Sequence, residues 1–292
     1  MSYKHILVPV DFSEYSYNAL DYALFIAKKY DSKVTVLHVV ALYGETFREE
    51  EQIEAVEEMI REHEKQRQQL LERSKQKTGG SGIETRTEMI RNISVPSGIL
   101  EYASERDADL IVMGNHGNTG FKKFLLGSVS QRVLRLADIP VITVQKDWKS
   151  RKIDNVLIPV DFSEASRRSV GKAAFLLRDF NATPHLVHVI EQDEHPHFYN
   201  VSFQSILETN PELEERISAN LKKLMPGSGS TPVISVLEGK AHSELDDYAE
   251  KHPIDLIVMS CRGHNLFENI LIGSTTEKMV AMAPCPVLVI PD

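Results

Sequence analysis

The chain has 292 residues, of which 42% are hydrophobic and 26% are charged, as expected of a globular protein of about two domains. Its net charge of -9 argues against nucleic acid and acidic membranes as partners, because both attract basic surfaces. No apolar run reaches the roughly 18 residues of a spanning helix, and the first residues lack the features of a signal peptide. We therefore expect a cytoplasmic protein with no nucleic-acid or membrane partner.

Short apolar runs alternate with amphipathic segments along the first half of the chain. The runs have the length of buried strands and lie at residues 5–10, 33–40, 83–90, 109–114 and 140–144. The segments between them have helical spacing and lie at 13–30, at 45–77, at 95–106 and after Gly127. Ser13 is the expected N-cap of the first helix. Five strands alternating with four helices predict a parallel sheet covered on both faces.

The second half repeats the first. "HILVPVDFSE" at 5–14 returns as "NVLIPVDFSE" at 155–164, and "ADLIVMGNHG" at 108–117 returns as "IDLIVMSCRG" at 254–263. Within the second copy, Asn210 and Pro211 predict the start of a middle helix.

The repeat defines the expected fold class. It is α/β, with two tandem doubly wound domains at 1–147 and 152–292, each a parallel five-stranded, Rossmann-like sheet. The final strand of each copy is an expected sheet edge that needs covering. The two copies therefore predict a pseudo-dimer within one chain, and a further homodimer is left open.

Three glycines mark the expected ligand site, because ligands of open parallel sheets bind beyond the carboxyl ends of the strands. Gly114 and Gly117 allow a tight turn after a strand, and Gly127 with Ser128 opens a helix whose first N–H groups favour an anion. Each glycine alone is more often a simple turn or cap. Together, beside Asp11, they favour a phosphate site that also uses the hydroxyls of Ser128 and Ser130. The spacing matches neither the P-loop nor G-x-G-x-x-G.

This spacing resembles a family signature. Gly114, two residues, Gly117, nine residues, Gly127 and Ser128 resemble the ATP-binding kind of universal stress protein, whose fold is adenine nucleotide alpha hydrolase-like. The resemblance covers essentially the whole chain. It implies ATP as the ligand, with Mg²⁺ or Mn²⁺ on its phosphates, and protein partners that stay unknown. The implied nucleotide-binding residues are Pro9, Val10, Asp11, Val39, Met113, Gly114, Gly117, Gly127, Ser128, Val129 and Ser130.

The resemblance also implies a role for each part of this site. Pro9, Val10 and Asp11 flank the adenosine, with Asp11 on the ribose, and the backbone of Val39 meets the adenine edge. Met113 and the two glycines that follow it line the ribose and the phosphate entrance. The residues from Gly127 to Ser130 hold the phosphates.

The second copy departs from the signature. Ser260 replaces Gly114 and Arg262 replaces His116, so we expect the serine to narrow the pocket. Arg262 either meets a phosphate or holds the loop shut. The retained second-domain candidates are Pro159, Asp161, Val189, Gly263, Gly273 and Ser274.

Other features have simpler explanations than a second site. His185 and His188 are three apart on a strand and so face opposite sides, and His195 and His197 fit a solvated loop better than a metal site. Cys261 and Cys285 are expected at opposite ends of neighbouring strands, too far apart for a disulfide.

Three functions remain open at this point. The favoured one is a stress-response protein that binds ATP without efficient catalysis, and no catalytic residue is assigned. The alternatives are a slow ATPase or adenylate-transferring enzyme that uses the same pocket, and a structural module that binds nothing.

Overall fold

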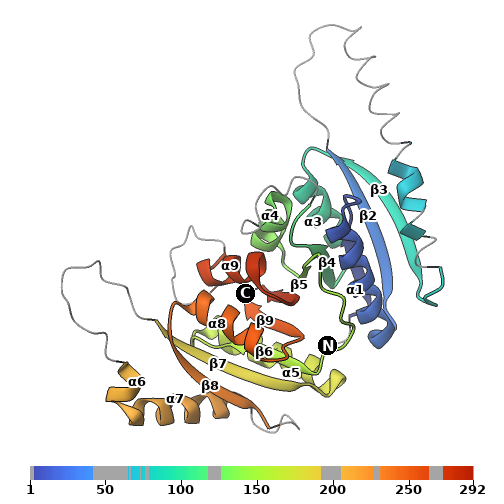
Figure 1. Cartoon of the computed structure of the whole chain (residues 1–292). Helices are drawn as coiled ribbons and strands as arrows, with labels where there is room; N and C mark the ends of the chain where they lie inside the picture. The colour runs from blue at the N-terminus through green and yellow to red at the C-terminus, as the bar shows by residue number, and fades with distance from the viewer. Residues whose placement is uncertain are drawn as a thin grey trace, which may run out of the picture. The chain divides into compact units, whose positions relative to one another are not determined.

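The computed structural model describes residues 3–41, 65, 67–72, 74–75, 79–117, 126–191, 205–225, 231–262 and 272–291. The chain divides into two compact units, the first comprising 1–121 and 127–146 and the second mainly 147–292 (Figure 1). The expected helix at 45–77 lies largely outside the described residues, apart from a helical stretch at 67–72.

The first unit is a five-stranded sheet with helices packed on it. Its strands run in the order β3-β2-β1-β4-β5, and the neighbouring pairs are parallel. Its elements are β1 (His5–Pro9), α1 (Glu14–Tyr30), β2 (Lys33–Ala41), β3 (Thr85–Asn92), α3 (Val95–Glu105), β4 (Leu110–Gly114), α4 (Ser128–Leu136) and β5 (Val141–Val144).

The second unit repeats this plan. Its strands run β10-β9-β6-β7-β8 and are again parallel, which confirms the predicted fold class. Its elements are β6 (Asn155–Pro159), α5 (Glu164–Phe180), β7 (Thr183–Glu191), α6 (Ile206–Thr209), α7 (Pro211–Lys223), β8 (Val233–Gly239), α8 (Ala241–Lys251), β9 (Leu256–Ser260), α9 (Ser274–Met282) and β10 (Val287–Ile290). The short helix α6 was not predicted.

The strand order places the ligand edge of each sheet. In the first unit the chain moves outward from β1 through β2 to β3, and then returns to β4 on the other side of β1. Right-handed crossovers put α1 on one face and α3 with α4 on the opposite face, and α3 and α4 are in contact. The direction of connection therefore reverses between β1 and β4, which is where doubly wound sheets bind ligands.

The helices begin where their capping residues predict. The Ser13 hydroxyl accepts a hydrogen bond from the Ser16 N–H at the start of α1, and Ser163 repeats this contact at the start of α5. Both helices end on a left-handed residue, Asp31 and Asn181. Helix α7 begins at Pro211, as predicted.

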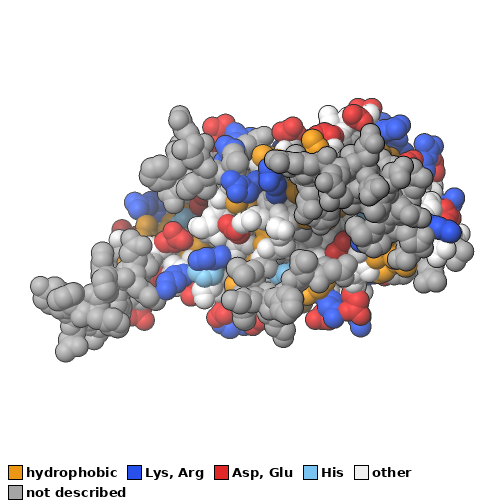
Figure 2. Space-filling view, turned by 90° about the horizontal axis from the view of Figure 1, so that it is seen from above, with side chains coloured by type: hydrophobic (Ala, Val, Ile, Leu, Met, Phe, Trp, Pro, Cys, Tyr) orange, Lys and Arg blue, Asp and Glu red, His pale blue; other side chains and the backbone are white. Residues whose placement is uncertain are grey.

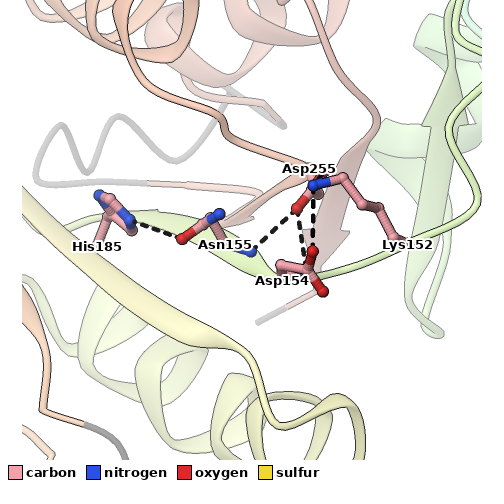
Figure 3. A network of polar contacts seen from close by, with 5 residues as sticks. All are labelled: Lys152, Asp154, Asn155, His185 and Asp255. Atoms are coloured by element: carbon pink, nitrogen blue, oxygen red, sulfur yellow. Dashed lines mark hydrogen bonds and ion pairs between the residues drawn. The ribbon is translucent and has the colours of Figure 1, made fainter.

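One aspartate ties two strand starts together in each unit. Asp255, which precedes β9, accepts hydrogen bonds from the N–H groups of Asp154 (2.9 Å) and Asn155 (3.1 Å) at the start of β6 (Figure 3). Lys152 approaches the same carboxylate to 3.5 Å. Asp109 contacts the N–H groups of residues 4 and 5 in the same way. These contacts lie at the end of the sheet opposite to the ligand edge.

Each unit also places one buried histidine beside this aspartate, but on a different strand. In the first unit His5 Nε2 lies 2.9 Å from the Thr35 hydroxyl. In the second unit the histidine is His185 on β7, and its ring lies 2.9 Å from the Tyr248 hydroxyl and 3.3 Å from Asn155 Oδ1 (Figure 3). The histidine thus lies on the first strand of the first unit and on the second strand of the second unit, and its polar partner lies on the neighbouring strand in each case.

The outer surface carries charges of both signs. Figure 2 shows Lys and Arg interspersed with Asp and Glu over the described part of one face. Among the described helices, none combines the length and the apolar character that crossing a bilayer requires.

Removing the Asp255 carboxylate is expected to destabilise the second unit. Asp255→Ala leaves two partly buried N–H groups without their charged acceptor, which costs about 2 kcal/mol of unfolding free energy. Urea unfolding of the variant measures this loss. Asp154→Ala is the matched control, because that carboxylate is 62% exposed, and a loss as large in the control would contradict the assignment.

The buried histidines predict a loss of stability in acid. Burial lowers the pKa of His5 and of His185 below 6.5, so the unfolded chain takes up protons at a pH where the folded chain does not. The stability that the two neutral histidines contribute is therefore fully present above pH 6.5, and the free energy of unfolding falls as the pH drops below that value.

His185→Thr, which introduces the residue found at Thr35 in the first copy, should flatten this dependence. Urea midpoints at about pH 7.5 and about pH 5.5 test the prediction. An equal acid shift in the wild type and the variant would contradict it.

Candidate functional site

A strained turn follows the first strand of each unit. Asp11 Oδ1 accepts a hydrogen bond of 3.0 Å from the Ser13 N–H, and Phe12 between them has a φ of 66°. Asp161 makes the same contact to Ser163 at 2.9 Å, across Phe162 with a φ of 63°. A left-handed conformation is costly for a bulky residue, so both units hold their aspartate in a conformation that surrounding contacts must enforce.

Gly114, at the end of β4, faces a helix. A Cβ at this position would lie 2.7 Å from the Tyr15 Cβ of α1 and 3.0 Å from the His116 carbonyl oxygen. The missing side chain of Gly114 therefore makes room for α1, and the expected approach of a ligand to this glycine stays a prediction.

Gly117 instead lies against the acidic group of the turn. A Cβ on Gly117 would lie 2.5 Å from Asp11 Oδ2. The structure thus brings the loop after β4 and the turn after β1 into direct contact, although the two residues are 106 positions apart in the sequence. This contact lies at the reversal point of the sheet.

The start of α4 closes the loop. Gly127 is the N-cap and provides no side-chain cap, and its N–H donates to the Asn115 carbonyl at 3.0 Å. Ser130 is buried and its hydroxyl donates to the Gly114 carbonyl at 2.8 Å, so this hydrogen is already used within the protein. The first N–H groups of the helix, from Ser128 onward, are the donors that a helix leaves without intrahelical partners. Ser128 itself is exposed.

A polar ring lies beside this helix start. Both ring nitrogens of His116 are buried and have no hydrogen-bond partner among the described residues, and the ring centroid lies 5.4 Å from that of Tyr15. An unsatisfied buried imidazole is costly and calls for an explanation.

The remaining predicted residues line the same edge. Pro9 ends β1, and Val10 follows it with its N–H on the Leu37 carbonyl. Met113, in β4, is buried. The side chain of Val39 packs under α3, where a Cβ on Gly98 would lie 2.8 Å from Val39 Cγ1, so Val39 has only its backbone left for other contacts.

Three residues at this edge were missed from the sequence. Gly98 was signalled by its place inside a helix, where glycine is unfavourable unless packing requires it. His38, within "LHVV", lies 2.7 Å from the Val10 carbonyl. Arg67 reaches His38 at 3.2 Å from a distant segment, which no local pattern signals.

The second unit builds the same frame. The Gly273 N–H donates to the Cys261 carbonyl at 2.8 Å, and the Thr276 hydroxyl donates to the Ser260 carbonyl at 2.9 Å. The Ser260 hydroxyl donates to the Arg262 carbonyl at 2.5 Å. The expected narrowing of the pocket by Ser260 stays a prediction.

The other second-domain candidates hold matching positions. Pro159 ends β6, Val189 lies in β7 and Ser274 begins α9, whereas Gly263 lies outside the described residues.

The histidines and cysteines behave as structural residues where they are described. The ring of His185 contacts Tyr248 of α8, whereas that of His188 contacts the Val160 carbonyl. Both cysteines, Cys261 and Cys285, are buried free thiols. His195 and His197 lie outside the described residues.

Gly114→Ala is expected to destabilise the first unit, because the added Cβ meets the backbone of α1. Overpacking of this kind costs about 1 to 3 kcal/mol, which thermal unfolding measures. Gly171→Ala in α5 is the matched control, since a Cβ there meets nothing within 4 Å. A Gly114→Ala protein as stable as the wild type would contradict the packing role.

Comparison with known proteins agrees with the repeated plan. A model of the universal stress protein family matches residues 2–145 and again residues 152–291. A universal stress protein of Methanocaldococcus jannaschii is 36% identical over 148 residues, covering 50% of this chain and 85% of that protein. A universal stress protein of Synechocystis is 25% identical over 98% of this chain and 99% of its own length.

Solved structures show the same fold over both copies. The crystal structure of a universal stress protein from Archaeoglobus fulgidus covers 98% of both chains with a TM-score of 0.65 and 24% identity. Two consecutive matches to one family model, together with two units of one topology, lead to a single conclusion. The chain belongs to the universal stress protein family, and it carries two domains of that family in tandem.

Proposed function

We propose that the first domain, residues 1–147, binds an adenine nucleotide, with ATP as the expected ligand, at the edge between β1 and β4. The observation that carries the proposal is the contact of Gly117 with the Asp11 carboxylate beside a helix start without a side-chain cap. The site combines a carboxylate, which suits the ribose hydroxyls, with helix N–H groups, which suit phosphate.

The arrangement of the edge supports a role for each part of the nucleotide. Pro9 and Val10 lie beside Asp11 for the adenosine, and the Val39 backbone is the part of that residue left for the adenine edge. Met113 and the loop glycines lie between the ribose and phosphate ends. The N–H groups of Ser128, Val129 and Ser130 would hold the phosphates.

Polar side-chain atoms without a described hydrogen-bond partner at the site favour a bound nucleotide. The two His116 ring nitrogens are buried and have no hydrogen-bond partner among the residues that the structure describes, and a ligand at the helix start would give them one. Among the described residues, no group of three or more His, Cys, Asp or Glu side chains is arranged to hold a metal. In this proposal an accompanying Mg²⁺ or Mn²⁺ is therefore held chiefly by the phosphate oxygens.

The proposal is binding without efficient turnover. Asp11 Oδ1 already accepts the Ser13 N–H and the Ser130 hydroxyl already donates to Gly114, so both groups hold the protein's own backbone. In this proposal the two groups orient the ligand and do not activate water. Nucleotide occupancy in a cytoplasmic stress-response protein would then be communicated to protein partners through the loop between Gly114 and Gly127.

The second domain, 152–292, is proposed as the degenerate copy. It retains Asp161, Gly273 and Ser274 in matching positions but has the substitution at Ser260. Its occupancy is decided by the number of nucleotides bound to each chain.

The test is the nucleotide content of the purified protein, released by denaturation and identified by chromatography against ATP, ADP, AMP and cAMP. The wild type is expected to carry one adenine nucleotide per chain, or two if the second domain also binds. Gly117→Ala should lower the affinity by about tenfold or more, because its Cβ displaces the Asp11 carboxylate. Gly171→Ala should keep the wild-type content. An empty wild type, even after soaking with ATP and Mg²⁺, would exclude the proposal.

A further inference from the structure

We propose that His38 is a positioning residue of the nucleotide site, which holds the Asp11 turn in its strained conformation through Val10 and Phe12. The inference rests on the proposed nucleotide binding by the first domain. It adds a residue on β2 that would set the affinity of the site without touching the ligand.

The hydrogen bonds of His38 fix its protonation. Its Nδ1 lies 2.7 Å from the Val10 carbonyl oxygen, which can only accept, so Nδ1 carries the proton. Its Nε2 lies 3.2 Å from Arg67 Nη1, and a guanidinium can only donate. The ring is therefore neutral, with Nδ1 as donor and Nε2 as acceptor.

These contacts enclose Asp11 from both sides. His38 binds the carbonyl of Val10, which precedes Asp11, and its ring packs on Phe12, which follows it, at a centroid distance of 4.8 Å. The Phe12 φ of 66° is a conformation that persists only where the surroundings impose it. His38 is buried and supplies both a directional bond and a packing surface to this turn.

Arg67 completes the support. Its guanidinium carbon lies 6.0 Å from the Phe12 ring centroid, at the limit of a cation–π contact, while it also binds His38. The arginine thus connects the Phe12 ring to the far side of the imidazole.

The second domain repeats the arrangement, with a histidine in the matching position and an arginine from a different element. His188 Nδ1 lies 2.6 Å from the Val160 carbonyl, and its ring lies 4.9 Å from that of Phe162. The guanidinium there comes from Arg167 of α5, 5.9 Å from the Phe162 ring and bonded to its carbonyl. Two different elements supply an arginine to the same turn, which indicates that the turn requires this support.

The charge state of His38 gives the arrangement a pH dependence. Burial lowers the pKa of His38 below 6.5, Arg67 lowers it further, and the Val10 bond and the Asp11 charge oppose this. Protonation of Nε2 removes the acceptor for Arg67 and places two like charges together. We therefore expect the nucleotide affinity to weaken as the pH falls below 6.5.

The test uses calorimetric titration of the full chain with ATP and Mg²⁺. His38→Phe keeps a ring beside Phe12 but removes the donor, and should weaken binding about tenfold. His38→Asn keeps a donor near the Nδ1 position and should bind within about threefold of the wild type. The extra weakening of the wild type between about pH 7.5 and about pH 5.5 should disappear in His38→Asn.

The matched control is His5→Asn. This variant changes a buried histidine at the opposite end of β1 to the residue that the second domain carries there, Asn155, and should leave the affinity unchanged. Wild-type affinity in His38→Phe, equal losses in the two His38 variants, or a similar loss in His5→Asn would each overturn the proposal.

A second measurement separates this inference from the proposed function. Amide NMR resonances of residues 11–13 report the turn whether or not nucleotide binds, and should shift in His38→Phe but not in His5→Asn. If the wild type binds no nucleotide, the proposed function fails, and unshifted amides in His38→Phe would then overturn the positioning role by themselves.

Discussion

The close approach of helix α1 to the end of strand β4 is the constraint on which the site depends. Gly114 leaves no room for a Cβ beside Tyr15, so α1 reaches the sheet where the direction of connection reverses. With the helix in this place, the turn that begins it puts Asp11 beside Gly117. The Gly114 carbonyl remains free of the helix and accepts the Ser130 hydroxyl, which fixes the start of α4. The contact between Gly114 and α1 thus determines both the packing of the helix and the geometry of the site.

The two domains act as an internal comparison of what this frame requires. Both keep the left-handed phenylalanine after the first strand and the aspartate at the opposite sheet end. Both also keep a hydroxyl from the helix after the fourth strand bonded to the last residue of that strand. They differ at Gly114 and Ser260, and in which strand carries the buried histidine. The retained hydrogen bonds join a side chain to a backbone group, and backbone groups are costly to leave unsatisfied when they are buried. The contacts that differ are pairs of side chains, such as His5 with Thr35 and His185 with Asn155, in which either strand can supply the histidine.

The site joins a rigid part to a strained part. The sheet and the N-cap at Gly127 are held by regular backbone hydrogen bonds, whereas the Asp11 turn depends on side chains from β2 and from residue 67. A turn that stores strain is sensitive to the loss of any one support. Ligand recognition in the first domain would therefore depend on residues that lie outside the glycine signature.

The sequence alone determined the repeat, the order of strands and helices, the caps at Ser13 and Pro211, and the spacing of the three glycines, because these depend on residues that are near each other in the chain. It also predicted parallel strands, since strands and helices alternate, and with them the sheet edge at which the site is proposed. Only the tertiary structure decided that Gly114 faces α1, that the Ser130 hydroxyl is already used, and that His38 and Arg67 support the Asp11 turn. Those contacts join residues far apart in the chain, and they depend on strand register and helix packing, which local patterns do not specify.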